Sequence, residues 1–253
     1  AGKVTALDHS KVLVSMTKEQ EAKYLASIKD VLTEKTLTVV TPAVLIEAAR
    51  FALTNEQSEI VARIGIQGGT MNPLHYGHIS ASLAGVIGEP YLDMVILANG
   101  GTVPDKPYAA DANIRNTMAR LAVASNARIE KWLEVTPIRA QAVDMFESLG
   151  NASLLLAGAD ESARRFNMDM AAFIWLFVAN PKVTWTYLVG SDKVKDYGKK
   201  NEKALLVDTL KATGVRVIYF ARTGEDIDYN KDIAPYDWMK TLWDEGFFHK
   251  SPI

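Results

Sequence analysis

Two stretches near the start of the chain place apolar residues at helical spacing. In residues 17–32 the apolar side chains fall on one stripe, and Thr17 begins a capping-box pattern at its start. Residues 41–53 also follow a helical pattern, and Pro42 takes the first helical position, where a proline is well tolerated. These patterns predict that residues 1–60 form a helical N-terminal extension.

Beyond this extension, short apolar runs alternate with helical patterns. Such alternation is typical of a parallel sheet wound with helices. The expected strands are residues 62–67, 92–98, 128–136, 183–190 and 214–221, and the expected helices are residues 78–86, 113–125 and 200–213. The sequence therefore predicts an α/β fold in which helices cover both faces of a doubly wound parallel sheet, with residues 62–67 and 186–190 near its centre.

A glycine-rich turn follows the first of these strands, in the stretch IGIQGGTMNPLHYGHIS at residues 64–80. Ligands of wound parallel sheets bind at the carboxyl ends of the strands, which is where Gly68 and Gly69 are expected. Because neither glycine has a side chain, backbone N–H groups can approach an anion closely, and Thr70 adds a hydroxyl donor. The helix expected to begin near His78 would direct its positive end at the same anion.

Two histidines three residues apart, His75 and His78, lie at this predicted helix start. They could face one anionic centre, since a neutral imidazole donates one hydrogen bond and an imidazolium adds a positive charge. Each feature also has a plain structural explanation, because paired glycines often form tight turns and histidines often cap helices. The spacing fits neither the P-loop nor the dinucleotide-binding glycine pattern, and the zinc-binding HExxH pattern does not surround these histidines.

Composition narrows the classes of partner. The formal charge of −2 and the charged fraction of 23% argue against general binding to nucleic acids or anionic membranes. The chain has no cysteine, which excludes disulfides, thiolate metal sites and thiol nucleophiles. No apolar run approaches the roughly 18 residues that span a bilayer, and the first residues lack the order of a signal peptide. We expect a cytoplasmic protein with no nucleic-acid or membrane partner, which could form a homo-oligomer.

Taken together, GGTMNPLHYGH at residues 68–78 closely resembles the G-G-T-F-D-P-x-H-x-G-H signature of the nucleotidyltransferase superfamily that carries the H-x-G-H motif. Other segments resemble further motifs of that superfamily: NGGTVPDKP its loop ending P-P-H-K, IRNTMARLAV its H-R-x-x-M-x-x-L-A-I helix, TYLVGSDKV its F-I-I-G-A-D turn, and VRVIYFARTG its V-x-x-R-P-G strand. The resemblance is greatest to the bacterial nicotinate mononucleotide adenylyltransferases. It implies a Rossmann-like nucleotidyltransferase fold for residues 61–253, with an insertion around residues 140–180.

The resemblance also implies a reaction: a nucleoside monophosphate, AMP from ATP in the nearest relatives, moves to a phosphorylated acceptor such as nicotinate or nicotinamide mononucleotide, and pyrophosphate leaves. Positioned donors and a Mg²⁺ ion bound with the triphosphate would carry the catalysis. The residues that the resemblance assigns are His75 and His78 for the reacting phosphates, Gly68, Gly69, Thr70 and Lys106 for phosphate binding, and Gly190 and Asp192 for the nucleotide. The alternatives are a cytidylyltransferase or another acceptor, and a nucleotide-binding module of the same fold without turnover.

Several positions near these motifs depart from the superfamily pattern. Met71 and Asn72 replace Phe-Asp, and Asp105 stands where the superfamily has histidine. The tryptophan that stacks on the nicotinate ring in the relatives has no direct counterpart shortly after Asp192, where Tyr197 could substitute.

The insertion and the C-terminus depart further. The insertion contains a second candidate turn ending at Asp160, and its Arg164 and Arg165 form either a surface pair or extra phosphate contacts. No arginine follows Arg222, so the S-S/T-x-x-R helix start that grips the β and γ phosphates in the superfamily is missing. Either another residue fills that role, or the chain is shortened, or efficient transfer is lost.

Overall fold

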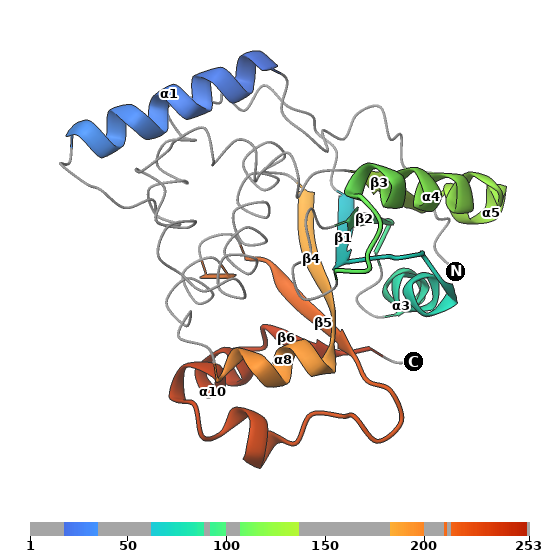
Figure 1. Cartoon of the computed structure of the whole chain (residues 1–253). Helices are drawn as coiled ribbons and strands as arrows, with labels where there is room; N and C mark the ends of the chain where they lie inside the picture. Colours follow the sequence, from blue (N-terminus) through green and yellow to red (C-terminus); the bar gives the residue numbers. More distant parts are fainter. Residues whose placement is uncertain are drawn as a thin grey trace.

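The computed structural model describes residues 18–34, 62–88, 92–99, 107–136, 183–199, 210–211 and 214–251. Within these ranges, six strands form one sheet in the order β3-β2-β1-β4-β5-β6, and every neighbouring pair is parallel (Figure 1). The strands are β1 (Ala62–Gly69), β2 (Met94–Asn99), β3 (Leu133–Thr136), β4 (Val183–Gly190), β5 (Arg216–Phe220) and β6 (Phe248–Lys250). This order is that of the Rossmann sheet, so the predicted α/β fold is confirmed.

Helices flank the sheet on both faces. The described ranges contain the helices α1 (Lys18–Glu34), α3 (Tyr76–Ile87), α4 (Ala112–Ala124), α5 (Ala127–Glu130), α8 (Ser191–Tyr197) and α10 (Asp237–Asp244), and the short π-helical turn η3 (Tyr229–Ile233). α3 packs against β1, β2 and β4, α4 packs against β2 and β3, and α8 packs against β4 and β5 (Figure 1).

Two apolar cores lie on the two faces, and β2, β4 and β5 contribute to both of them. Ile66 of β1 belongs to the core that contains Met239 of α10. Leu97 of β2 and Leu188 of β4 belong to the other core, together with Val123 of α4. Because successive side chains of a strand point to opposite faces, a strand that is apolar throughout can support two helical layers.

Four of the five predicted strands are confirmed, as β1, β2, β4 and β5, and the segments expected near the centre form the central pair β1 and β4. The single strand predicted over residues 128–136 is wrong in its first half, because α5 precedes β3 there. The side chain of Asn126 accepts a hydrogen bond from the backbone N–H of Arg128 at 3.0 Å and so begins a helical turn. This local cap outweighs the β propensity of the residues that follow it.

The helix predicted after the glycine turn is confirmed as α3, but it begins at Tyr76 rather than at His78. The helix predicted over residues 113–125 is confirmed as α4. α1 confirms the first helix of the predicted extension, and its Tyr24, Ile28 and Val31 are buried as the apolar stripe requires.

Other predictions fall on parts of the chain that the structure does not describe. These are the helix over residues 41–53 with most of the extension, the helix over residues 200–213 except residues 210–211, and the insertion around residues 140–180. Among the helices in the described ranges, none is long and apolar enough to cross a membrane.

Candidate active site

Gly68 and Gly69 were predicted to form a turn after the first strand, but they are the last two residues of β1 and pair with Ala98 and Asn99 of β2. The glycine turn that they begin lies where two neighbouring central strands end. β1 pairs with β2 on one side and with β4 on the other, and Gln67 of β1 is opposite Leu188 of β4. Two residues further along, Gly69 ends β1 and Gly190 ends β4. The chain leaves β1 toward β2 and leaves β4 toward β5, so the connections diverge and open the crevice in which wound parallel sheets bind ligands. The predicted residues Gly68, Gly69, Gly190 and Asp192 are therefore brought to one place by the topology.

His75 caps the helix that follows the glycine turn. Its Nδ1 accepts a hydrogen bond from the N–H of Gly77 at 3.1 Å, and the Nδ1 of His78 accepts one from the N–H of His75 at 3.2 Å. Two imidazoles thus form the capping box that usually needs a hydroxyl and a carboxylate. The first turn of α3 has no acidic residue, so no carboxylate there offsets the positive end of the helix dipole.

The two imidazole rings lie against each other beside the glycine turn. Their centroids lie 3.8 Å apart, and the ring planes are tilted by 31°. A neutral imidazole whose Nδ1 accepts a hydrogen bond carries its proton on Nε2. The Nε2 of His78 lies 3.9 Å from the position that a Cβ on Gly69 would take. The capping box therefore places an Nε2–H donor of His78 directly beside Gly69.

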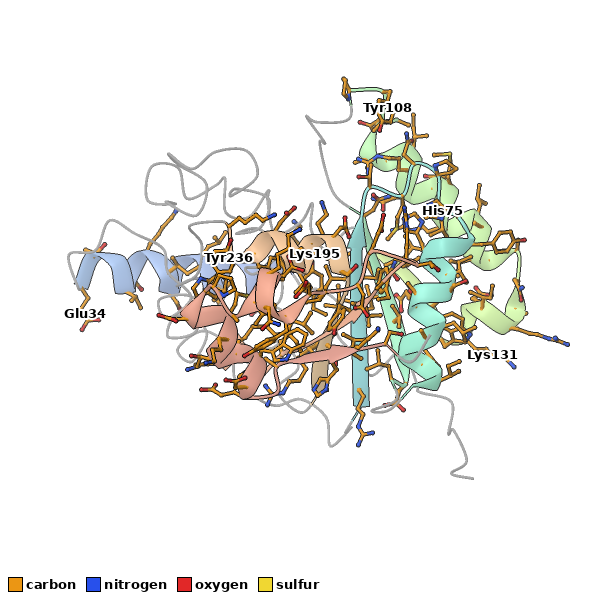
Figure 2. The ribbon with its side chains drawn as sticks, turned by 90° about the horizontal axis from the view of Figure 1, so that it is seen from below. Glu34, His75, Tyr108, Lys131, Lys195 and Tyr236 are labelled. Atoms are coloured by element: carbon orange, nitrogen blue, oxygen red, sulfur yellow. The ribbon has the colours of Figure 1, made fainter. Side chains whose placement is uncertain are left out.

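Gly77, the glycine of the H-x-G-H motif, is needed for a steric reason. A Cβ on Gly77 would lie 2.9 Å from Cε1 and 3.0 Å from Nδ1 of His75, closer than side-chain carbons normally approach. Only glycine leaves room for an imidazole that folds back over the first turn of the helix. Figure 2 shows His75 beside the start of α3, with Lys195 of α8 on the other side of β1.

On the β4 side of the crevice, Asp192 lies in the first turn of α8. A Cβ on Gly190 would lie 2.4 Å from the carboxylate oxygen Oδ1 of Asp192, so this side chain folds back over the end of β4. The hydroxyl of Ser191 donates to the carbonyl oxygen of Glu225 at 2.7 Å and ties the start of α8 to the loop after β5. An exposed carboxylate in this position can accept hydrogen bonds from hydroxyl groups of a ligand, and it also stabilises the N-terminus of α8.

The two departures after the glycine turn keep its structure. Met71 adopts a left-handed backbone with φ of 48°, which is uncommon for a side chain of this size, and it is only 1% exposed. Its side chain belongs to the core under α3 and α4. The Oδ1 of Asn72 accepts a hydrogen bond from the N–H of Ala110 at 3.2 Å, which is a bond that an aspartate could also accept.

Arg115 of α4 contacts the candidate site but received no role from the sequence, although it takes the arginine position of the H-R-x-x-M-x-x-L-A-I pattern that its segment resembles. Its guanidinium is buried and donates to the carbonyl oxygen of Thr70, the carbonyl oxygen of Ala110 and the side chain of Asn99. The available signal was its place in the IRNTMARLAV segment, where a charge lies among apolar helical positions.

Five candidate residues lie outside the parts of the chain that the structure describes. They are Lys106, Asp105, Asp160, Arg164 and Arg165, and their contacts stay predictions. Tyr197 is described, and its proposed role as a stacking residue is wrong. It is only 5% exposed and packs in the core that contains Trp185 and Val217, so its ring is not available to stack on a nicotinate ring.

The helix start that follows β5 does not supply the missing arginine. The turn η3 is capped by Asp228, whose Oδ1 accepts the N–H groups of Asn230 at 3.0 Å and Lys231 at 3.3 Å. A carboxylate of the protein therefore occupies the N–H groups that a phosphate could have used. Within the described ranges, no cluster of three or more histidine, cysteine, aspartate or glutamate side chains could hold a metal ion.

Comparison with known proteins gives three similar sequences, each named as a probable nicotinate-nucleotide adenylyltransferase. The identity is 45% over 69 residues for the protein of Synechococcus sp. (strain JA-3-3Ab), 40% over 67 residues for Gloeobacter violaceus and 41% over 70 residues for Moorella thermoacetica. These matches cover 26–27% of this chain, and the chain spans about a third, 32%, of the length of each relative. They confirm the resemblance that the glycine and histidine motifs predicted.

No model of a known protein family matches the chain. Among solved structures, a nicotinic acid mononucleotide adenylyltransferase of Plasmodium falciparum, complexed with NaAD, aligns with a TM-score of 0.47 at 13% sequence identity. The alignment covers 76% of each chain.

Proposed function

We propose that this protein is an adenylyltransferase that moves AMP from ATP to a phosphorylated pyridine nucleotide, nicotinate mononucleotide, and releases pyrophosphate. The observation that carries the proposal is the imidazole capping box at the start of α3, whose two rings lie beside the glycine turn at the carboxyl end of β1. The names of the three sequence relatives support nicotinate mononucleotide as the acceptor.

In this reaction a phosphate oxygen of the acceptor attacks the α-phosphorus of ATP, and the bond to the β-phosphate oxygen breaks. No nucleophile from the protein is required, so the work is to position two polyanions and to stabilise the charge on the phosphoryl oxygens. We assign the backbone N–H groups of Gly68, Gly69 and Thr70 to a phosphate-binding cradle, and the Nε2–H groups of His75 and His78 to the reacting phosphates. The N-terminus of α3 adds its positive dipole to the same place.

Asp192 and Gly190 are proposed to meet the nucleotide from the β4 side, where the carboxylate would accept ribose hydroxyl hydrogen bonds. Lys106 is proposed to contact a phosphate. Mg²⁺ would enter with the triphosphate, because Mg²⁺ in phosphoryl transfer is commonly held by substrate phosphates, water and at most one or two carboxylates.

The proposal is tested by measuring pyrophosphate release from purified protein with Mg²⁺. ATP and CTP are each paired with nicotinate mononucleotide, nicotinamide mononucleotide and a phosphorylated alcohol. We expect the highest kcat/KM with ATP and nicotinate mononucleotide, and the dinucleotide product is identified by mass spectrometry.

Other outcomes separate the alternatives. A preference for CTP and the phosphorylated alcohol would replace the proposal with a cytidylyltransferase. Binding of ATP in a calorimetric titration without pyrophosphate release from any pair would indicate a nucleotide-binding module. A His78→Ala variant assayed in parallel excludes a contaminating enzyme, because a contaminant would keep its activity.

A further inference from the structure

One buried side chain joins the glycine turn to two neighbouring segments of the chain. Arg115 is 1% exposed. Its Nη1 donates to the carbonyl oxygen of Thr70 and to the Oδ1 of Asn99, both at 2.6 Å, and its Nε donates to the carbonyl oxygen of Ala110 at 2.7 Å. These acceptors belong to the turn after β1, to the last residue of β2 and to the loop before α4.

These bonds hold the turn from both sides. Thr70 directly follows Gly69, so the bond to its carbonyl oxygen fixes the peptide plane at the end of the cradle. The N–H of Ala110 donates to the Oδ1 of Asn72, which lies two residues beyond Thr70. Arg115 therefore fixes the turn directly at Thr70 and indirectly, through Ala110, at Asn72.

An arginine is suited to this task in a way that a lysine is not. The guanidinium is planar and presents its donors in a fixed fork, whereas an ammonium is a compact point charge on a flexible stem. Loops that carry site residues are precise only when surrounding side chains lock them in place. The three hydrogen bonds of Arg115 lock the relative positions of a helix start, a strand end and the glycine turn.

We propose that Arg115 is a positioning residue, which holds the glycine turn and the two imidazoles after it in the geometry that the reacting phosphoryl group needs, without touching substrate. This inference rests on the proposed adenylyl transfer. Misplacement of reacting groups by about 1 Å can lower a rate by roughly 100-fold. Loss of the Arg115 guanidinium should therefore lower kcat more than it raises the KM for ATP.

The test compares Arg115→Lys with the matched variant Arg120→Lys, which changes an exposed arginine of the same helix. In the pyrophosphate-release assay we expect Arg115→Lys to lose about 10- to 100-fold in kcat, with a change in the KM for ATP of less than about threefold. Arg120→Lys should leave both parameters unchanged. For Arg115→Ala, low concentrations of guanidinium ion should restore part of kcat, whereas sodium chloride at the same ionic strength should not.

A second readout does not depend on turnover. The chain has four histidines, so the imidazole nitrogens of His75 and His78 can be followed by NMR of histidine-labelled protein. We expect the resonances of both rings to move in Arg115→Lys and to stay in place in Arg120→Lys, while His249 of β6 is unaffected in each.

The outcomes separate this inference from the proposed function. Retention of kcat within about twofold in Arg115→Lys, or unmoved His75 and His78 resonances, would overturn the positioning role. Absence of turnover in the parent protein would reject the proposed function, whereas the NMR comparison would still decide the role of Arg115. If Arg115→Lys does not fold, Asn99→Ala takes its place. That variant removes one acceptor and should give a smaller change of the same kind, and unmoved resonances would again reject the inference.

Discussion

The imidazole rings of His75 and His78 lie 3.8 Å apart between their centroids, and each ring binds a backbone N–H through its Nδ1. One set of contacts thereby serves two purposes. The Nδ1 atoms cap the helix, and the Nε2 of His78 lies beside Gly69, at the end of α3 that carries the positive dipole.

The first prediction follows from the Nε2–H of His78. His78→Ala should lose about 2 to 4 kcal/mol of transition-state stabilisation, measured as the rate constant in single-turnover assays, with a smaller effect on ATP binding. His78→Asn should recover part of the loss, because an amide N–H can donate to the same oxygen. His249→Ala, at the far edge of the sheet in β6, is the control and should keep full activity. Full single-turnover activity of His78→Ala would reject the proposed role.

The second prediction separates activity from stability at Gly77. In Gly77→Ala the new Cβ would lie within 3.0 Å of the ring of His75, so the ring must move or give up its hydrogen bond. Loss of the cap costs about 1 kcal/mol, and alanine regains about the same amount through its higher helix propensity. We expect a nearly unchanged urea midpoint but a kcat lowered by about tenfold, because the imidazoles are displaced.

The control for Gly77 is Ser80→Ala, at an exposed position of the same helix. It should leave both the urea midpoint and kcat close to those of the parent. A Gly77→Ala variant with normal kcat would show that the position of the His75 ring does not matter for turnover.

Much of the fold could be predicted because local patterns and tertiary packing agree. The strand at residues 62–67 and the helix after His75 are apolar with the right period, and both were found near the expected bounds. The single strand predicted over residues 128–136 was wrong because the side chain of Asn126 caps a helical turn just before the β-forming residues. The hydrophobic pattern alone does not show whether one side-chain cap stabilises a helical turn more than the β propensity of several residues stabilises a strand.

The candidate site was predictable where a motif is contiguous and not where contacts are distant in sequence. The glycines and histidines lie within residues 68–78, so one contiguous motif brings them together, and their contacts with substrate stay a prediction. Arg115 acts on Thr70 from 45 residues away, and no periodicity reports such a contact. Tyr197 was misjudged for a related reason, since its burial depends on β4, β5 and α10 rather than on its neighbours in sequence.

The third prediction concerns the carboxylate on the β4 side. Asp192→Ala should raise the KM for ATP by about tenfold if the carboxylate accepts ribose hydrogen bonds, since a hydrogen bond to a charged group is worth about 1.5 to 3 kcal/mol. Gly190→Ala should have a similar effect, because its Cβ would lie 2.4 Å from the Oδ1 of Asp192 and would push the carboxylate aside.

The double variant makes this prediction specific. If Gly190→Ala acts only by displacing Asp192, the double variant should have the same KM for ATP as Asp192→Ala alone. Additive effects would show that Gly190 contributes separately, and an unchanged KM in Asp192→Ala would remove the carboxylate from the nucleotide site.

The fourth prediction concerns the pH dependence of stability and rests on the ion pair between Asp226, in the loop after β5, and Lys250 of β6. The hydrogen bond from the Lys250 ammonium holds the pKa of the Asp226 carboxyl below its usual range. A carboxyl whose pKa is lower in the folded than in the unfolded state adds stability above its unfolded pKa of about 3.9, and this stability is lost as the pH falls through the folded value. Lys250→Met should therefore lower the free energy of unfolding at pH 7 by at most about 1 kcal/mol, since both side chains are about half exposed, and the difference from the parent should shrink below about pH 4.

Urea unfolding is the suitable measurement because it adds no salt to screen the pair, and Lys240→Met, at an exposed lysine of α10, is the control. A deficit of equal size at pH 7 and pH 3 would show that Lys250 acts through its aliphatic stem and not through Asp226.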